Sequence, residues 1–215
     1  MPTSTPSSTP TATRTPIPTN TPTFTPSFTP TATSVPVGGT ITIQINAAAD
    51  DVNEVNATTE PSGATVWLGN GGTAVTSFTG LRFNNVTIPP HATITSAHLE
   101  FYSTQSQWIS ISFQMAADAA DSSAPFTAAN RPGLRTLTAA RVSHSSNISW
   151  AANTWYSLEE IRTVVEEVVN RLNWRNGNSL SIILSGTGSN WGRKFFRSFE
   201  GGATFAVRLV ITYTT

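Results

Sequence analysis

The sequence contains no cysteine, and only 11% of its 215 residues are charged. Without cysteine the chain forms no disulfide and offers no thiolate to a metal, which fits the cysteine-poor extracellular proteins of many bacteria. The formal net charge is zero, so we expect no basic patch for nucleic acid or anionic lipid. No run of about 18 apolar residues occurs, so we also expect no membrane span. These absences favour an extracellular or cell-surface protein of bacterial type.

The chain is expected to divide into an extended Thr/Pro-rich arm, residues 1–37, and one β-sandwich domain, residues 38–215. The second part is long enough to bury a core of its own. Met1 is followed directly by Pro2 and Thr3, without the basic and then apolar segments of a signal peptide. We therefore expect either that a leader has been removed or that the chain is a fragment of a longer one.

The arm has a strict two-residue pattern, because its threonines are odd-numbered and its prolines even-numbered. Proline fixes its own φ and pushes the residue before it out of the helical region, so the arm is predicted to be extended. A polyproline II rod would expose every hydroxyl, as in an O-glycosylated stalk. Candidate sites for covalent O-linked glycans are Thr21, Thr23, Thr25, Thr29, Thr31 and Thr33.

A β conformation of the same arm would imply a different role. Prolines confined to even positions remove N–H donors along one edge only, so the other edge keeps its capacity to pair with a partner strand. Phe24 and Phe28 share the proline face and would lie about 13 Å apart. We predict these two side chains as assembly contacts between copies of the chain. A flexible low-complexity linker remains the third interpretation.

Beyond the arm, short apolar-alternating runs bounded by turn formers predict eight or nine strands and hence an all-β, two-sheet sandwich. The predicted strand runs are ITIQINA, ATVWLG, AVTSFTGLRF, ATITSAHLEFYS, WISISFQMA, HSSNISW, SLSIILSG, RKFFRSFE and TFAVRLVITYT.

One α-helix is predicted in SLEEIRTVVEEVVNRLNW, where it would cover an open end or edge of the sandwich. Ser157 and Glu160 have the spacing of a capping box, and Glu167 with Arg171 has that of an i,i+4 ion pair. The helical spacing also predicts an apolar stripe made of Leu158, Ile161, Val165, Val168 and Leu172.

Several of these segments together carry a family resemblance. The sequence combines GLRFNNVTIPPHATITSAHLEFYS, then EEVVNRLNW, then GNSLSIILSGTGS, and RSFEGG before the last strand. It resembles an extracellular bacterial β-sandwich module that is similar to carbohydrate-binding-module-like jelly rolls, often found beside Thr/Pro linkers. The resemblance implies a jelly-roll-like sandwich, and its motifs specify a fold and not a ligand.

Candidate site residues are few. Asp50, Asp51 and Glu54 could supply oxygen ligands to a structural calcium ion, although a solvated acidic loop is the alternative. The histidines are scattered without metal-ligand spacing, and no Gly-x-Ser-x-Gly elbow occurs, so we do not expect an enzyme.

Six tryptophans suggest sugar binding, because aromatic faces stack on pyranose rings. Trp174 and Trp191 are the predicted exposed sugar contacts. Trp67, Trp108 and Trp150 lie in strand patterns and are predicted to be core residues.

Two functional hypotheses follow. The favoured one is a structural subunit of an extracellular fibre or surface appendage, assembled head to tail through the arm. The alternative is a carbohydrate-binding module that a Thr/Pro linker joins to a secreted enzyme.

Overall fold

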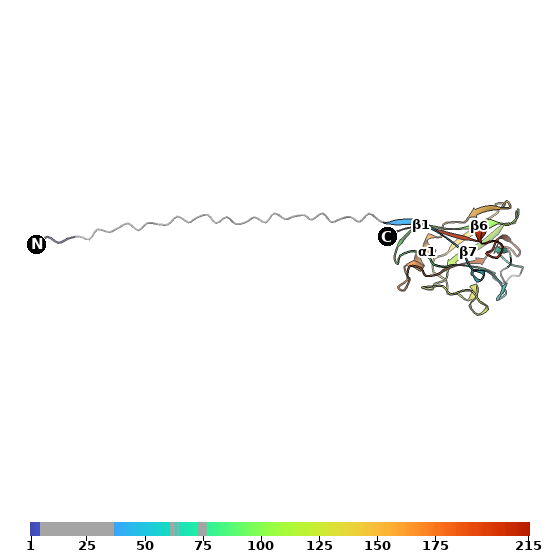
Figure 1. Cartoon of the computed structure of the whole chain (residues 1–215), viewed down its shortest axis with the longest axis horizontal. Helices are drawn as coiled ribbons and strands as arrows, with labels where there is room; N and C mark the ends of the chain where they lie inside the picture. Colours follow the sequence, from blue (N-terminus) through green and yellow to red (C-terminus); the bar gives the residue numbers. More distant parts are fainter. Residues whose placement is uncertain (5–36, 61–62, 64, 73–76) are drawn as a thin grey trace. The chain divides into compact units, whose positions relative to one another are not determined.

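The computed structural model describes residues 1–4, 37–60, 63, 65–72 and 77–215 (Figure 1). The predicted arm sites, Phe24, Phe28 and the threonines between 21 and 33, lie outside these residues. The chain divides into two units, Met1–Val35 and Pro36–Thr215. The second unit is a β-sandwich, which we call the head.

The head contains two antiparallel sheets, as predicted. The first sheet has the order β1 (Gly38–Gln44), β12 (Arg208–Thr214), β6 (Thr93–Ser103), β11 (Arg193–Arg197) and β4 (Thr65–Gly69), with β9 (Thr154–Ser157) also paired to β6. The second sheet has the order β3 (Thr58–Glu60), β2 (Asp51–Val55), β5 (Phe78–Phe83), β10 (Leu180–Gly186), β7 (Ile111–Ala117) and β8 (Val142–Ser146). Short 3-10 turns cover Ala48–Asp50, Ala128–Asn130, Pro132–Leu134 and Ala203–Phe205.

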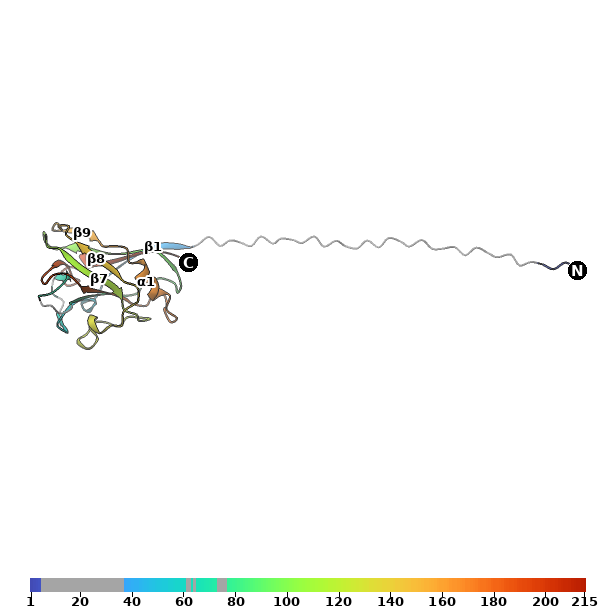
Figure 2. The same cartoon turned by 180° about the vertical axis from the view of Figure 1, so that it is seen from behind.

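The strand order is that of a jelly roll. Glu100 of β6 pairs with Arg208 of β12 and with Ser157 of β9, so β12 and β9 lie on opposite edges of β6. The orders β1-β12-β6-β9 and β5-β10-β7-β8 therefore form the two four-stranded layers of a jelly roll. Strands β2 and β3 extend one layer, and β11 and β4 extend the other. Figures 1 and 2 show the C-terminus beside β1, whose Gly38 pairs with Thr214.

Every predicted run contains a strand, but β2, β3 and β9 were not predicted. The β2 sequence, DVNEV, is polar because Glu54 forms an ion pair with Arg131 and Asp51 and Asn53 make buried hydrogen bonds. A hydrophobic pattern does not reveal such a strand. In β6, a register shift at Thr212 and Tyr213 of its partner moves the buried positions from even-numbered Ile94 to odd-numbered Ala97, Leu99 and Phe101.

Helix α1 (Arg162–Val169) is shorter than predicted. The capping box was wrong, because Ser157 belongs to β9 and Glu160 accepts hydrogen bonds from Ser96 Oγ and the Ala97 N–H of β6. Of the predicted apolar stripe, Leu158, Ile161, Val165 and Val168 are buried, although Leu158 lies before the helix and Ile161 is its N-cap. Leu172 follows the helix and is 84% exposed.

The predicted Glu167–Arg171 pair does not form. Glu167 accepts the backbone N–H groups of Ala139 and Ala140, whereas Arg171 donates to Asp121. Helix α1 contacts β6 of one sheet and β7 of the other, so it covers the core between the layers, as expected. Among the described residues, no helix is long and apolar enough to cross a membrane.

Candidate functional site

Trp108 is the most exposed tryptophan of the described head. It lies in the loop between β6 and β7, and 78% of its surface is accessible. The prediction that it is a core residue was wrong. Trp108 has the same parity as Ser112 and Gln114, which face outward from β7, and the opposite parity to buried Ile111 and Phe113. Its indole therefore points to solvent.

Gln107 fixes this loop to two neighbouring segments. Its backbone N–H and C=O pair with the C=O and N–H of Trp150, at 2.8 and 2.7 Å. Its side-chain Nε2 donates to the Phe195 carbonyl and to Ser103 Oγ, while its Oε1 accepts the Phe195 N–H. Gln107 is buried, so these bonds have little competition from water. They tie the residue before Trp108 to Phe195 in the middle of β11.

A groove of about 380 Å³ lies beside Trp108. Its other aromatic wall is a stacked pair, Trp150 and Tyr156, with ring centroids 4.7 Å apart and planes at 4°. The Tyr156 hydroxyl accepts the Ala151 N–H, which fixes the ring. The remaining lining supplies hydroxyl, amide and methyl groups from Ser106, Gln107, Ser149 and Ala151.

Lys194 supports the groove from inside. The side chain is fully buried, and its Nζ donates to the Ile148 carbonyl and lies 5.5 Å from the centre of the Trp150 ring. Burial lowers the pKa of the Lys194 ammonium group. The contact ties the segment before Trp150 to β11, so the groove wall does not depend on its own loop alone.

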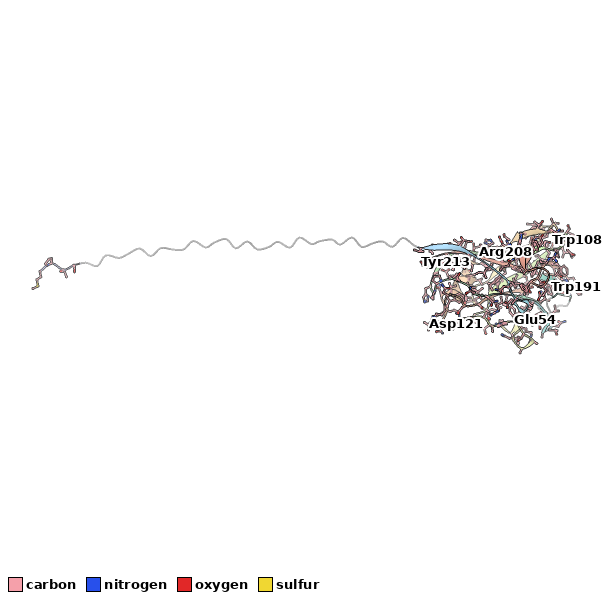
Figure 3. All side chains as sticks on the ribbon, in the orientation of Figure 1. Glu54, Trp108, Asp121, Trp191, Arg208 and Tyr213 are labelled. Carbon is pink, nitrogen blue, oxygen red and sulfur yellow. The ribbon has the colours of Figure 1, made fainter. Side chains whose placement is uncertain are left out.

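A smaller groove of about 130 Å³ also borders Trp108 and is lined by Gln105, Ser106, Gln107, Trp108, Ile109, Arg193 and Phe195. Figure 3 shows Trp108 and Trp191 at the same end of the head, away from Tyr213 and Asp121. Arg193 connects this groove to Trp191, because its guanidinium carbon lies 4.6 Å from the Trp191 ring centre.

Trp191 is 58% exposed, and its backbone has a φ of 61°, a conformation unusual for a bulky residue. The indole lies against Gly72, where an added Cβ would come within 1.8 Å of it. A side chain at position 72 would therefore displace the indole from its place.

Trp174 is not a sugar contact, which corrects the prediction. It is fully buried in the core, and its Nε1–H donates to the Ile88 carbonyl at 3.0 Å. The chain turns after α1 and directs this indole inward, because Trp174 N–H bonds back to Arg171. Trp67 and Trp150 are buried, as predicted.

The acidic residues Asp50, Asp51 and Glu54 form neither a calcium site nor a solvated loop. All three are buried. Asp50 pairs with Arg82 at 2.9 Å, and Glu54 pairs with Arg131 at 2.8 Å. Among the described residues, no three His, Cys, Asp or Glu side chains are arranged to hold a metal ion. The carboxylates of Asp50 and Glu54 are paired with arginines, so they are not free to bind calcium.

No protein-family model matches the chain, and no curated protein matches it either. The functional assignment therefore rests on the head's own geometry. Sequence reasoning missed Trp108, Gln107 and Tyr156. The parity of Trp108 with polar residues was an available signal, whereas the Gln107 contacts with Trp150 and Phe195 join residues far apart in the chain.

Proposed function

We propose that the head is a glycan-binding module whose ligand lies along the groove beside Trp108. The observation that carries the proposal is the exposed Trp108 indole next to a groove lined by Trp150, Tyr156 and small polar side chains. A sugar ring has apolar C–H faces and hydroxyl edges, so it fits a site with rings on its walls and hydroxyl and amide groups between them.

Pre-organisation supports the same proposal. The Trp150–Tyr156 stack, the Gln107 hydrogen bonds and the buried Lys194 hold the groove walls before any ligand binds. A ligand that binds such a site loses less free energy to the ordering of loops.

The test is a screen of the full chain against neutral and acidic oligosaccharides, followed by calorimetry on those that bind. We expect saturable binding to at least one glycan and a roughly ten-fold or larger loss of affinity in Trp108→Ala. Leu172→Ala is the matched control, because it removes an equally exposed apolar side chain outside the groove. No saturable binding, or unchanged affinity in Trp108→Ala, would overturn the proposal.

Fibre assembly through the Thr/Pro arm is a second proposal, compatible with the first. It is supported by the position of β1, which ends its sheet and pairs only with β12 among the described strands. An open edge of this kind accepts an added strand from another chain. Negative-stain microscopy of native protein is expected to show filaments, and O-linked glycans on the arm would raise the intact mass. Monomers at high concentration would overturn the assembly proposal.

A further inference from the structure

Arg193 is a partly buried arginine that forms no ion pair with a carboxylate among the described residues. Arg82, Arg131 and Arg135 each form an ion pair at 2.9 Å or less. The Arg193 guanidinium lies instead among aromatic rings, 4.6 Å from the ring centre of Trp191, 5.1 Å from that of Phe195 and 5.4 Å from that of Trp67.

The aromatic surroundings prepare Arg193 to bind an anion. Rings on several sides restrict the side chain through cation–π contacts, so less conformational entropy is lost when a ligand binds. Arg193 also lines the smaller groove next to Trp108. The described residues that line the two grooves include no aspartate or glutamate, so no acidic side chain of the grooves competes for the charge.

We propose that Arg193 binds the carboxylate of a uronic acid unit, so that the ligand of the head is an acidic polysaccharide. This inference rests on the proposed glycan-binding function. A guanidinium donates two parallel N–H bonds to a carboxylate, a geometry that a neutral sugar hydroxyl does not match. The net charge of the chain is zero, so the attraction is local to this groove and not a property of the whole surface.

The two grooves indicate a chain and not a single sugar. They share Ser106, Gln107 and Trp108 as lining residues, so the two grooves adjoin at Trp108. One sugar unit stacks on Trp108 beside the Trp150–Tyr156 pair, and a neighbouring unit places its carboxylate at Arg193.

The Trp150–Tyr156 pair also borders a hollow that contains an acidic side chain. This third hollow is lined by Glu159 and His144, which form a hydrogen-bonded pair. The Glu159 side chain is 45% exposed. Its negative charge would repel a ligand carboxylate that entered this hollow. The bound chain therefore has its acidic unit at the Arg193 end.

The experiment compares galacturonate, mannuronate and glucuronate oligosaccharides with their carboxyl-reduced, neutral counterparts, using calorimetry on the full chain. We expect wild type to bind at least one uronate chain roughly ten-fold or more tightly than its reduced form. Arg193→Gln should bind both forms equally, because the guanidinium is gone. Arg193→Lys should retain part of the preference, because it keeps the charge and loses the planar fork.

Arg175→Gln is the matched control, since it removes an exposed arginine that bonds to the Leu172 and Trp174 carbonyls. It should retain the full preference for the uronate. Equal binding of acidic and reduced chains by wild type, or a preference that survives in Arg193→Gln, would overturn the inference and leave glycan binding in place. Binding of sulfated neutral chains but of no uronate would also overturn it. No binding to any probe would overturn the proposed function as well.

Discussion

Asp51 lies buried at the start of β2, and burial raises the pKa of its carboxyl group to about 8. The nearby Glu200 and Asp50 raise this pKa further, while a hydrogen bond from the Phe199 N–H lowers it. Oδ1 of Asp51 has no hydrogen-bond partner among the described residues. The folded head therefore prefers the protonated acid.

The contribution of Asp51 to the stability of the head should consequently fall as the pH rises from about 4 to 8. The pKa of Asp51 is 3.8 in the reference state and about 8 in the fold, so between these values the folded state binds the additional proton. Above about 8 the contribution of Asp51 no longer changes with pH. Asp51→Asn keeps an acceptor for Phe199 and removes the charge.

We expect Asp51→Asn to melt at a higher temperature than wild type near pH 8, with the difference shrinking towards pH 4. Thermal melting followed by circular dichroism at a series of pH values measures the difference, which separates Asp51 from other titrating groups. A constant difference across the series would show that Asp51 is ionised in the fold at all of these pH values.

The tryptophans show where side-chain burial can be predicted from the sequence and where it cannot. Trp67, Trp108 and Trp150 were predicted to be buried because they lie in strand-like runs, and this was right for Trp67 and Trp150 but wrong for Trp108. Trp174 follows the helix, where neither helical nor strand periodicity predicts which side chains are buried. The turn in which its N–H bonds to the Arg171 carbonyl directs it into the core. Exposure near an element's end depends on that local turn and on what packs above it.

At the scale of elements, α1 offers a direct comparison within one predicted stripe. Val165 is fully buried between the sheets, whereas Leu172 is exposed beyond the helix end. Val165→Ala should lower the free energy of unfolding by about 1–3 kcal/mol, through lost burial and a cavity. Leu172→Ala should change it by no more than about 0.5 kcal/mol.

Urea denaturation of the two variants measures this difference, with a shared m-value as the check that the unfolded states are comparable. Equal destabilisation by the two substitutions would mean that the helix extends to Leu172 in solution.

The strands of the sandwich could be predicted from the sequence, whereas the contacts that join its loops to the sheets could not. Alternating apolar residues predicted β5, β6, β7, β10 and β12, because each must bury one face. The Glu160 carboxylate accepts the Arg162 N–H at the start of α1, which is near in sequence, and also the Ala97 N–H of β6, which is not. A long-range partner of this kind leaves no local pattern. Gln107 is a second example, and it organises the candidate site.

At the scale of the whole molecule, the arm is expected to connect subunits. Phe24 and Phe28 lie four residues apart among small residues and prolines, so an extended strand would place both on one face. Buried in a neighbouring subunit, each would contribute roughly 1.5–3 kcal/mol. The double change Phe24→Ser, Phe28→Ser should therefore abolish or greatly weaken filament formation in negative-stain images.

The melting temperature of the head should be the same in this double variant and in wild type, because the two residues lie outside the head. Thr25→Ser, which retains the hydroxyl, serves as the control for a change in the same segment. Wild-type filaments in the double variant would identify the arm as a spacer.

The central claim, that a glycan lies against Trp108, is tested most directly by the indole N–H signals in a nitrogen–proton NMR spectrum. The six tryptophans give separate signals that report their own surroundings. Titration with a glycan that binds in the screen should shift the Trp108 signal most. The Trp174 signal should stay in place, because its N–H is bonded to Ile88 inside the core. Saturable binding that leaves the Trp108 signal unchanged would contradict the claim.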